Sequence, residues 1–331
     1  MQFACDYLLL NIIFFIVGVA ILVKGSDWFV DAAAALARSF GVPELIIGLT
    51  LVSIGTSLPE LASSLCAAFY GESNFIIGNI VGSNTANIAL ILGAGLVLGG
   101  SMSFSRQLIW RDMFFLLLLG SGLMAWYYFK IDVSSAAEYG FGRIGGALLL
   151  IFCVIYSLML CRQSTGEQEN NDDNEETIQK ISRSKAAALI VLALVMITGG
   201  AKLMVDTVVW SALKLGVSEL MISLTIVAVG TSLPELAVTI SGILKKRNDI
   251  ALGNIIGSGL YNILLIIGAC ATVSPLTGSG RSSVDSMLIM NGTALLLWIF
   301  LLTGKRLHRW QGVIFVALYA AFIAWSIICA R

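Results

Sequence analysis

The sequence predicts an all-α polytopic membrane protein with ten transmembrane helices, arranged as two inverted five-helix repeats. Three observations lead to this fold class. Of the 331 residues, 58% are hydrophobic and only 12% are charged; apolar stretches recur along the chain; and one long segment occurs twice. A soluble domain carries roughly 25% charged residues, so the composition excludes a soluble globular protein.

Ten apolar stretches have the length of about 20 residues that a helix needs to cross a bilayer. They lie near residues 7–35, 43–69, 74–98, 108–129, 142–161, 186–213, 218–244, 249–273, 284–303 and 309–329. With ten spans, both termini share one face of the membrane. Thirteen Lys and Arg residues fall on the opposite face and five on the face of the termini. Since basic residues mark the cytoplasm, we expect a protein of the plasma or inner membrane with both termini outside.

The predicted organisation is one five-helix repeat over 1–161, an acidic cytoplasmic linker over 162–185 and a second repeat over 186–331. The linker holds six acidic residues among polar ones and cannot bury apolar surface. We interpret it as a solvated connection; a weak regulatory calcium site is the alternative.

A shift of 175 residues aligns the two halves without a gap. It places GVPELIIGLTLVSIGTSLPELA from Gly41 on GVSELMISLTIVAVGTSLPELA from Gly216, and GNIVGSNTANIALILG from Gly78 on GNIIGSGLYNILLIIG from Gly253. Over 41–93 there are 26 identities in 53 positions. Because each copy has an odd number of spans, the second copy enters from the opposite face. Inverted repeats with a binding site near the midplane are common in secondary transporters.

Two of the four prolines, Pro59 and Pro234, lie at matched positions inside spans two and seven, each followed by a glutamate, Glu60 and Glu235. Proline inside a helix removes a hydrogen bond and frees a carbonyl group, and broken backbone at membrane depth is tolerated where a polar cavity satisfies it. A charged side chain at the bilayer centre costs about 2.5 to 3.5 kcal/mol on insertion scales. The repeated acids are therefore candidate functional residues.

Neutral oxygen ligands accompany both acids. Counted along a helix, Thr56 and Ser57 share a face with Glu60, and the matched hydroxyls share a face with Glu235. In spans three and eight, further pairs are four residues apart. These neutral ligands are Thr56, Ser57, Ser83, Asn87, Thr231, Ser232, Ser258 and Asn262. The six scattered cysteines and the single histidine, His308, provide no soft metal cage. Oxygen ligands are those that sodium and calcium require.

Two facing carboxylates repel each other when the site is empty, and one calcium ion or two or more sodium ions neutralise them. Such a site couples the two ions by competition, so it predicts exchange of one for the other. A proton could also neutralise the glutamates, which leaves calcium/proton exchange as the alternative. No cofactor is expected. The expected partners are the ions and the lipid bilayer, and a monomer suffices for transport.

Other classes fit the sequence less well. The net charge is zero, so no basic surface points to nucleic acid. A membrane enzyme with Ser57 or Ser232 as nucleophile lacks a nearby histidine or a suitably placed lysine. A passive channel does not fit a sequestered site with two carboxylates; single-channel conductance would distinguish it.

The paired GTSLPEL and GNxxGS motifs resemble those of the calcium/cation antiporter superfamily, and the chain is similar to the prokaryotic calcium/sodium antiporters of the sodium/calcium exchanger type. The resemblance covers nearly the whole chain. It implies ten helices in an inverted repeat, with ion-binding helices two, three, seven and eight at the centre, past which helices one and six slide during alternating access.

The resemblance also implies roles for individual residues. Glu60 and Glu235 would be the central carboxylates, and Ser83 and Ser258 would bind sodium. Carbonyl groups and further side chains would complete the site: the carbonyls of Ser53 and Ala228, and the side chains of Thr56, Ser57, Thr231, Ser232, Asn87 and Asn262. Well-studied exchangers often have aspartate at the position of Asn262, whereas this chain has an amide there, which opens the questions of stoichiometry and of potassium or proton participation.

Overall fold

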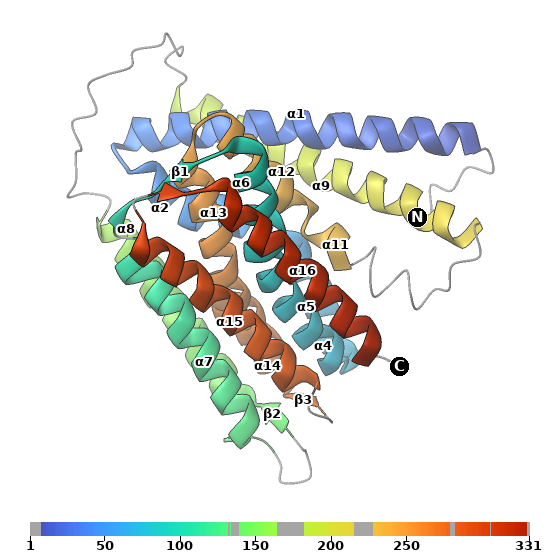
Figure 1. The fold of residues 1–331 in the computed structure, drawn as a ribbon, viewed down its shortest axis with the longest axis vertical. Coiled ribbons are helices and arrows are strands. Elements are labelled where there is room, and N and C mark those ends of the chain that lie inside the picture. Colours follow the sequence, from blue (N-terminus) through green and yellow to red (C-terminus); the bar gives the residue numbers. More distant parts are fainter. Residues whose placement is uncertain are drawn as a thin grey trace. The chain divides into compact units, whose positions relative to one another are not determined.

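The structure is a computed structural model and describes residues 8–106, 108–131, 133, 139–163, 182–214, 228–278, 282–304 and 306–329. Helices dominate it (Figure 1). Residues 164–181 of the predicted linker and residues 218–227 of the seventh predicted span lie outside the described residues.

The first half of the chain builds its helices in the order that the hydropathy predicts. Three of them contain a π-helical segment, labelled η. The elements are α1 (Leu8–Phe40), α2 (Glu44–Ile47), η1 (Gly48–Val52), α3 (Ser53–Thr56), α4 (Leu58–Tyr70), α5 (Ser73–Ala86), η2 (Asn87–Leu92), α6 (Gly93–Gly99), β1 (Met102–Ser103), η3 (Leu108–Met113), α7 (Phe114–Phe129), β2 (Tyr139–Phe141) and α8 (Arg143–Gln163).

The second half follows the same order. Its elements are α9 (Arg183–Lys214), α11 (Ala228–Thr231), α12 (Leu233–Leu244), α13 (Asn248–Tyr261), η5 (Asn262–Ile267), α14 (Gly268–Val273), β3 (Leu276–Gly278), α15 (Ser282–Thr303), β4 (Arg306–Leu307) and α16 (Arg309–Cys329).

Seven helices in the described part of the chain are long and apolar enough to cross a membrane, and the broken pair Glu44–Thr56 and Leu58–Tyr70 makes an eighth if it is one span. Two shorter apolar helices, Leu233–Leu244 and Arg309–Trp325, fall within predicted spans seven and ten. The expectation of a helical membrane protein is confirmed. The number of ten spans stays a prediction.

The repeat in the sequence is also a repeat of local structure. The 175-residue shift moves α3 onto α11 and α5 onto α13 with identical bounds, and it moves the six-residue segment η2 onto η5. In a π-helical turn the hydrogen bonds join residues five apart instead of four, and such turns are often found at functional sites. Both matched asparagines, Asn87 and Asn262, are the first residue of such a segment.

The chain forms two compact units, and each draws on both sequence repeats. Unit 1 comprises Met1–Thr56 and Ser157–Asn254, and unit 2 comprises Ser57–Tyr156 and Ile255–Arg331. The units are packed bodies, whereas the predicted domains are segments of sequence.

Unit 1 is built on the pair of long helices α1 and α9, which run side by side (Figure 1). Small residues allow the close approach: a Cβ at Gly200 would lie 2.7 Å from the Leu22 nitrogen and 2.8 Å from the Gly18 carbonyl oxygen. Helix α12 also packs against α1. The core between them is apolar and includes Phe29, which is completely buried, and a run of alanines in α1.

Unit 2 packs α15 against α5, α7 and α16 (Figure 1). Two glycine pairs mark helix crossings. A Cβ at Gly312 of α16 would lie 2.7 Å from the Gly93 carbonyl oxygen, and a Cβ at Gly146 of α8 would lie 2.9 Å from the Gly268 carbonyl oxygen. Gly93 and Gly268 match under the shift, so both copies of the repeat use the same residue for a close crossing. Short antiparallel pairings join β1 to β4 and β2 to β3.

Candidate ion-binding site

Each candidate glutamate lies in the first turn of a helix that follows a break in the backbone. Glu60 is the third residue of α4 and Glu235 the third residue of α12. The breaks fall at Ser57 (φ −84°, ψ 6°) and Ser232 (φ −91°, ψ 5°), outside the regular helical range. The expectation of broken backbone beside each acid is therefore confirmed.

The position of the prolines explains these breaks. Pro59 and Pro234 are each the second residue of their helix, where the missing N–H group would have had no helical partner anyway. The expectation that proline interrupts a continuous helix from within is wrong in this detail, because the chain leaves the helical conformation one residue before each helix starts. For the same reason Thr56, Ser57 and Glu60 do not share a face of one helix: Thr56 ends α3, and Ser57 lies in the break.

Both glutamates are buried, with 0% of Glu60 and 1% of Glu235 exposed. Burial disfavours a carboxylate, but the N-terminal end of a helix carries a partial positive charge that favours it. The two positions thus combine strong desolvation with a favourable local dipole, which suits a carboxylate that a cation binds and leaves.

The predicted ligands divide equally between the two units. Unit 1 holds Ser53, Thr56, Ala228, Thr231, Ser232 and Glu235, and unit 2 holds Ser57, Glu60, Ser83, Asn87, Ser258 and Asn262. Each unit therefore contains one of the two carboxylates together with neutral oxygen groups. The pairing of the two carboxylates stays a prediction.

In unit 1 the side chain of Asn254 links its own helix α13 to α3 and α12. Its Oδ1 accepts a hydrogen bond from Thr56 Oγ1 at 3.0 Å. Its Nδ2 donates to Thr239 Oγ1 at 3.0 Å and to the carbonyl oxygen of Glu235 at 3.4 Å. Asn254 and Thr239 have no exposed surface. This amide fixes α3 and α12 to α13.

The Ser53 hydroxyl anchors the same region. Its Oγ lies 2.6 Å from the Gly48 carbonyl oxygen, 3.1 Å from that of Gly253 and 3.2 Å from that of Asn254. The Ser53 carbonyl oxygen, which the family resemblance implied as a ligand, lies 3.3 Å from Thr56 Oγ1 and is the more distant of two alternative acceptors for that hydroxyl.

In unit 2 the corresponding link joins α5 to α4, where Asn79 Nδ2 donates to Ser64 Oγ at 3.1 Å. Helix α4, which carries Glu60, also packs against η5, which begins at Asn262. Asn262 Nδ2 donates to Asn84 Oδ1 at 2.8 Å. Asn84 Nδ2 in turn donates to the Gly259 carbonyl oxygen at 3.3 Å.

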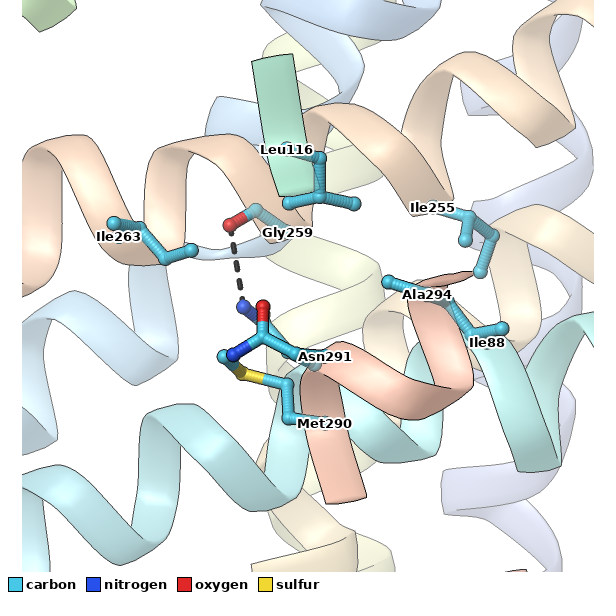
Figure 2. Close-up of a pocket in the computed structure, with 9 residues that line it drawn as sticks. Ile88, Leu116, Ile255, Gly259, Ile263, Met290, Asn291 and Ala294 are labelled. Carbon is cyan, nitrogen blue, oxygen red and sulfur yellow. Dashed lines mark hydrogen bonds between the residues drawn. The ribbon is translucent and has the colours of Figure 1, made fainter. Parts of the chain in front are cut away.

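A small cavity in unit 2 adjoins this amide chain (Figure 2). It has about 10 Å³ of space for a water centre, close to the minimum for one water. Its lining is mainly apolar and includes Ile88, Leu116, Ile263 and the amide of Asn291.

Sequence reasoning missed Asn79, Asn254, Ser64 and Thr239, although a signal was present. Asn79 matches Asn254 and Ser64 matches Thr239 under the 175-residue shift. A pair of hydrogen-bonding residue types kept at the same spacing in both copies is the pattern that would have found them. Asn84 gave no such signal, because its matched residue is a glycine.

Other repeated acids have structural partners. Asp31 and Asp206, which match each other, form ion pairs with Lys245 at 2.7 Å and Lys202 at 3.2 Å. Glu44, which matches Glu219 under the same shift, pairs with Arg247 at 2.7 Å. No group of three or more His, Cys, Asp or Glu that could hold a metal occurs among the residues described. Glu60 and Glu235 therefore remain separate candidate carboxylates, and their sharing of one ion stays a prediction.

Comparison with known proteins gives one family. The family model described as "Sodium/calcium exchanger protein" matches residues 10–162 and 185–328. The sodium/calcium exchanger MaX1 of Methanosarcina acetivorans is 34% identical over 341 residues, with 95% of this chain and 97% of the relative covered. The inner membrane protein YrbG of Escherichia coli K12 is 31% identical over 320 residues, with 94% of each chain covered.

Solved structures agree. A structure of the sodium-calcium exchanger NCX_Mj soaked with 10 mM Na⁺ and zero Ca²⁺ matches with a TM-score of 0.81 and 32% identity, covering 96% of this chain and 99% of that chain. The matching proteins are membrane exchangers, which makes this chain an integral membrane transporter for cations and not an enzyme. The chain belongs to the sodium/calcium exchanger family. Its activity is cation exchange with calcium among the ions exchanged, and the expected resemblance is confirmed.

Proposed function

We propose that this protein is a secondary active antiporter that exchanges calcium for sodium by alternating access, with Glu60 and Glu235 as the shared carboxylates. The observation that carries the proposal is the matched position of these two acids, each in the first turn of a helix directly after a backbone break and each almost completely buried. One such acid could be a structural accident. Two at the same place in both copies of a repeat indicate a common task.

Charge supports exchange over uniport. Two buried carboxylates without a cation are costly in a low-dielectric interior, and either one calcium ion or two or more sodium ions would restore neutrality. The two loads compete for one set of ligands, so occupancy by one excludes the other. Exchange of one calcium for three sodium ions would move net charge; exchange for two would not.

The remaining proposed ligands are oxygen donors of low charge, which fits hard cations. They are the hydroxyls of Thr56, Ser57, Ser83, Thr231, Ser232 and Ser258, the amides of Asn87 and Asn262, and the carbonyls of Ser53 and Ala228. Spans three and eight carry four of these residues. In the most apolar stretch of each, 78% and 94% of the residues are buried. In the most apolar stretch of α1 only 28% of the residues are buried. Protein rather than lipid therefore surrounds most of spans three and eight, which supports their role in holding the ions.

The proposed architecture is two inverted five-helix repeats, 1–161 and 186–331, joined by the cytoplasmic linker 162–185, with both termini outside the cell membrane. The equal bounds of α5 and α13 and of η2 and η5 support the repeat, and the inner-membrane name of the relative YrbG supports the location. A single chain contains both carboxylates, so one copy suffices for transport.

Replacement of each acid tests the site. Glu60→Gln and Glu235→Gln remove one charge with little change of shape, and each should abolish sodium-gradient-driven uptake of calcium-45 in proteoliposomes. The matched control is Glu72→Gln, which removes an exposed acid just before α5 and should leave uptake at the unmodified level. Normal uptake in either buried variant would sink the two-carboxylate site.

The coupling ion is tested by imposing one gradient at a time. With a sodium gradient and equal pH on both sides, calcium-45 uptake should proceed; with a pH gradient and no sodium, it should stop. The opposite result would make the protein a calcium/proton exchanger that uses the same glutamates as proton carriers.

A further inference from the structure

The two asparagines at matched positions in the proposed site differ in what holds their amide groups. Asn262 Nδ2 donates to Asn84 Oδ1 at 2.8 Å. Asn262 Oδ1, in contrast, is buried and has no hydrogen-bond partner within the described part of the chain. For Asn87, neither amide atom has a hydrogen-bond partner among the described residues. One amide is therefore held and the other is not.

The direction of the Asn84 amide follows from chemistry. A backbone carbonyl can only accept, so the side-chain atom of Asn84 that lies 3.3 Å from the Gly259 carbonyl oxygen must be the donor Nδ2. Asn84 Oδ1 is then the atom that faces Asn262. Since this oxygen accepts, Asn262 must present its own Nδ2 to it. The Gly259 carbonyl thus decides, through Asn84, which end of the Asn262 amide remains for another ligand.

That remaining end is the one a cation needs. Asn262 Oδ1 carries lone pairs and attracts a cation, whereas an NH₂ group in the same place would repel it. The side chains of Asn84 and Asn262 are buried, with 4% and 1% of their surface exposed, so bulk solvent does not compete for these hydrogen bonds.

The second copy of the repeat has no side chain that could hold the Asn87 amide as Asn84 holds the Asn262 amide. The residue that matches Asn84 is Gly259, which has no side chain to receive an amide and contributes its carbonyl to the arrangement around Asn262 instead. A Cβ at Gly259 would lie 3.2 Å from Leu116 Cδ1. The glycine therefore breaks the symmetry between the two copies.

We propose that Asn84 is a positioning residue for ion binding: it fixes the Asn262 amide with its oxygen available to the transported cation. This inference rests on the proposed function, in which Asn262 is a ligand. Asn262 is then a preorganised ligand whose amide orientation is fixed, while Asn87 can turn either end of its amide toward the site.

A double-mutant cycle tests the role of Asn84. Asn84→Ala should raise the KM for calcium in calcium-45 exchange roughly fivefold to tenfold, the effect of one lost buried hydrogen bond, while the maximal rate changes by less than about twofold. In an Asn262→Asp background the same replacement should change the KM by less than about twofold, because a carboxylate presents an oxygen in either orientation. A carboxylate at this position also supplies oxygen ligands for a hard cation, so this background should transport.

Controls separate positioning from packing. Asn291→Ala removes the other amide beside the same cavity (Figure 2); its Nδ2 donates to Met287 of its own helix, and the KM should stay unchanged. If Asn84→Ala does not give folded protein, Asn84→Ser takes its place in the cycle. An equal KM effect in both backgrounds, or no effect in the first, overturns the role of Asn84. An unchanged KM in Asn262→Ala would instead remove Asn262 from the proposed site.

Discussion

Asn79 and Asn254 match under the 175-residue shift, and each donates a hydrogen bond from its Nδ2 to the hydroxyl of a matched residue on the preceding helix. Asn79 donates to Ser64 at 3.1 Å and Asn254 to Thr239 at 3.0 Å. Asn254 also contacts Thr56 and the Glu235 carbonyl. The same residue type in the same place thus connects two segments in one copy and three in the other.

Asn254→Ala should consequently destabilise the protein more than Asn79→Ala. A buried hydrogen-bonding group left without its partner costs about 1 to 3 kcal/mol. Replacement of Asn254 removes a hydrogen-bond partner from Thr56, Thr239 and the Glu235 carbonyl. Thermal unfolding of the two purified variants in the same detergent measures the difference. A larger loss for Asn79→Ala would contradict the link to Thr56.

Gly253 and Gly78 are matched glycines with different surroundings. A Cβ at Gly253 would lie 2.9 Å from the carbonyl carbon of Gly48, a backbone atom that cannot rotate away, whereas a Cβ at Gly78 has no atom within 4 Å in the described structure. Gly253→Ala should cost about 1 to 3 kcal/mol or more through overpacking, and Gly78→Ala should be tolerated. Yield and monodispersity after size-exclusion chromatography report both, and equal behaviour would refute the crossing of η1 and α13.

Asp112 is a buried carboxylate that Arg111 and Tyr156 compensate. The Arg111 Nε lies 2.7 Å from Asp112 Oδ1, and Tyr156 donates to the same oxygen at 2.9 Å. Arg111→Ala should cost about 3 to 5 kcal/mol because it leaves a buried charge uncompensated. The double variant Arg111→Ala with Asp112→Ala should recover part of that loss. Calorimetry of the three proteins checks this, and a double variant that is less stable than the single one would contradict it.

Lys245 joins the region after α12 to α1 through two acids of unequal burial. It lies 2.7 Å from Asp31, whose side chain is 62% exposed, and 3.7 Å from Asp27, which also accepts a hydrogen bond from Ser241 at 2.6 Å. Asp31→Asn should change stability by less than about 1 kcal/mol, as for other exposed pairs. Asp27→Asn should cost more, since it weakens a charged hydrogen bond as well. Melting temperatures of the two variants measure the difference, and a larger decrease for Asp31→Asn than for Asp27→Asn would contradict the prediction.

The ends of most helices followed from hydropathy, but their interruptions did not. Predicted spans three and eight, near 74–98 and 249–273, agree with helices over 73–99 and 248–273. The π-helical segments inside them and the breaks at Ser57 and Ser232 depend on hydrogen-bond register, which hydropathy does not record. For this reason the shared helix face expected for Thr56 and Glu60 was wrong, while the ligand roles of the site residues stay a prediction.

The sequence by itself determined that this chain lies in a membrane, that it contains a repeat, and which carboxylates and candidate oxygen ligands recur in both copies. These properties are local or periodic, so counting residues suffices. Only the tertiary structure decided that Asn254 ties Thr56 to Thr239, that Gly253 and not Gly78 must be a glycine, and that the Gly259 carbonyl sets the Asn262 amide through Asn84. Identical motifs acquire different neighbours when they fold, and the neighbours determine which atom of an amide is hydrogen-bonded and which is not.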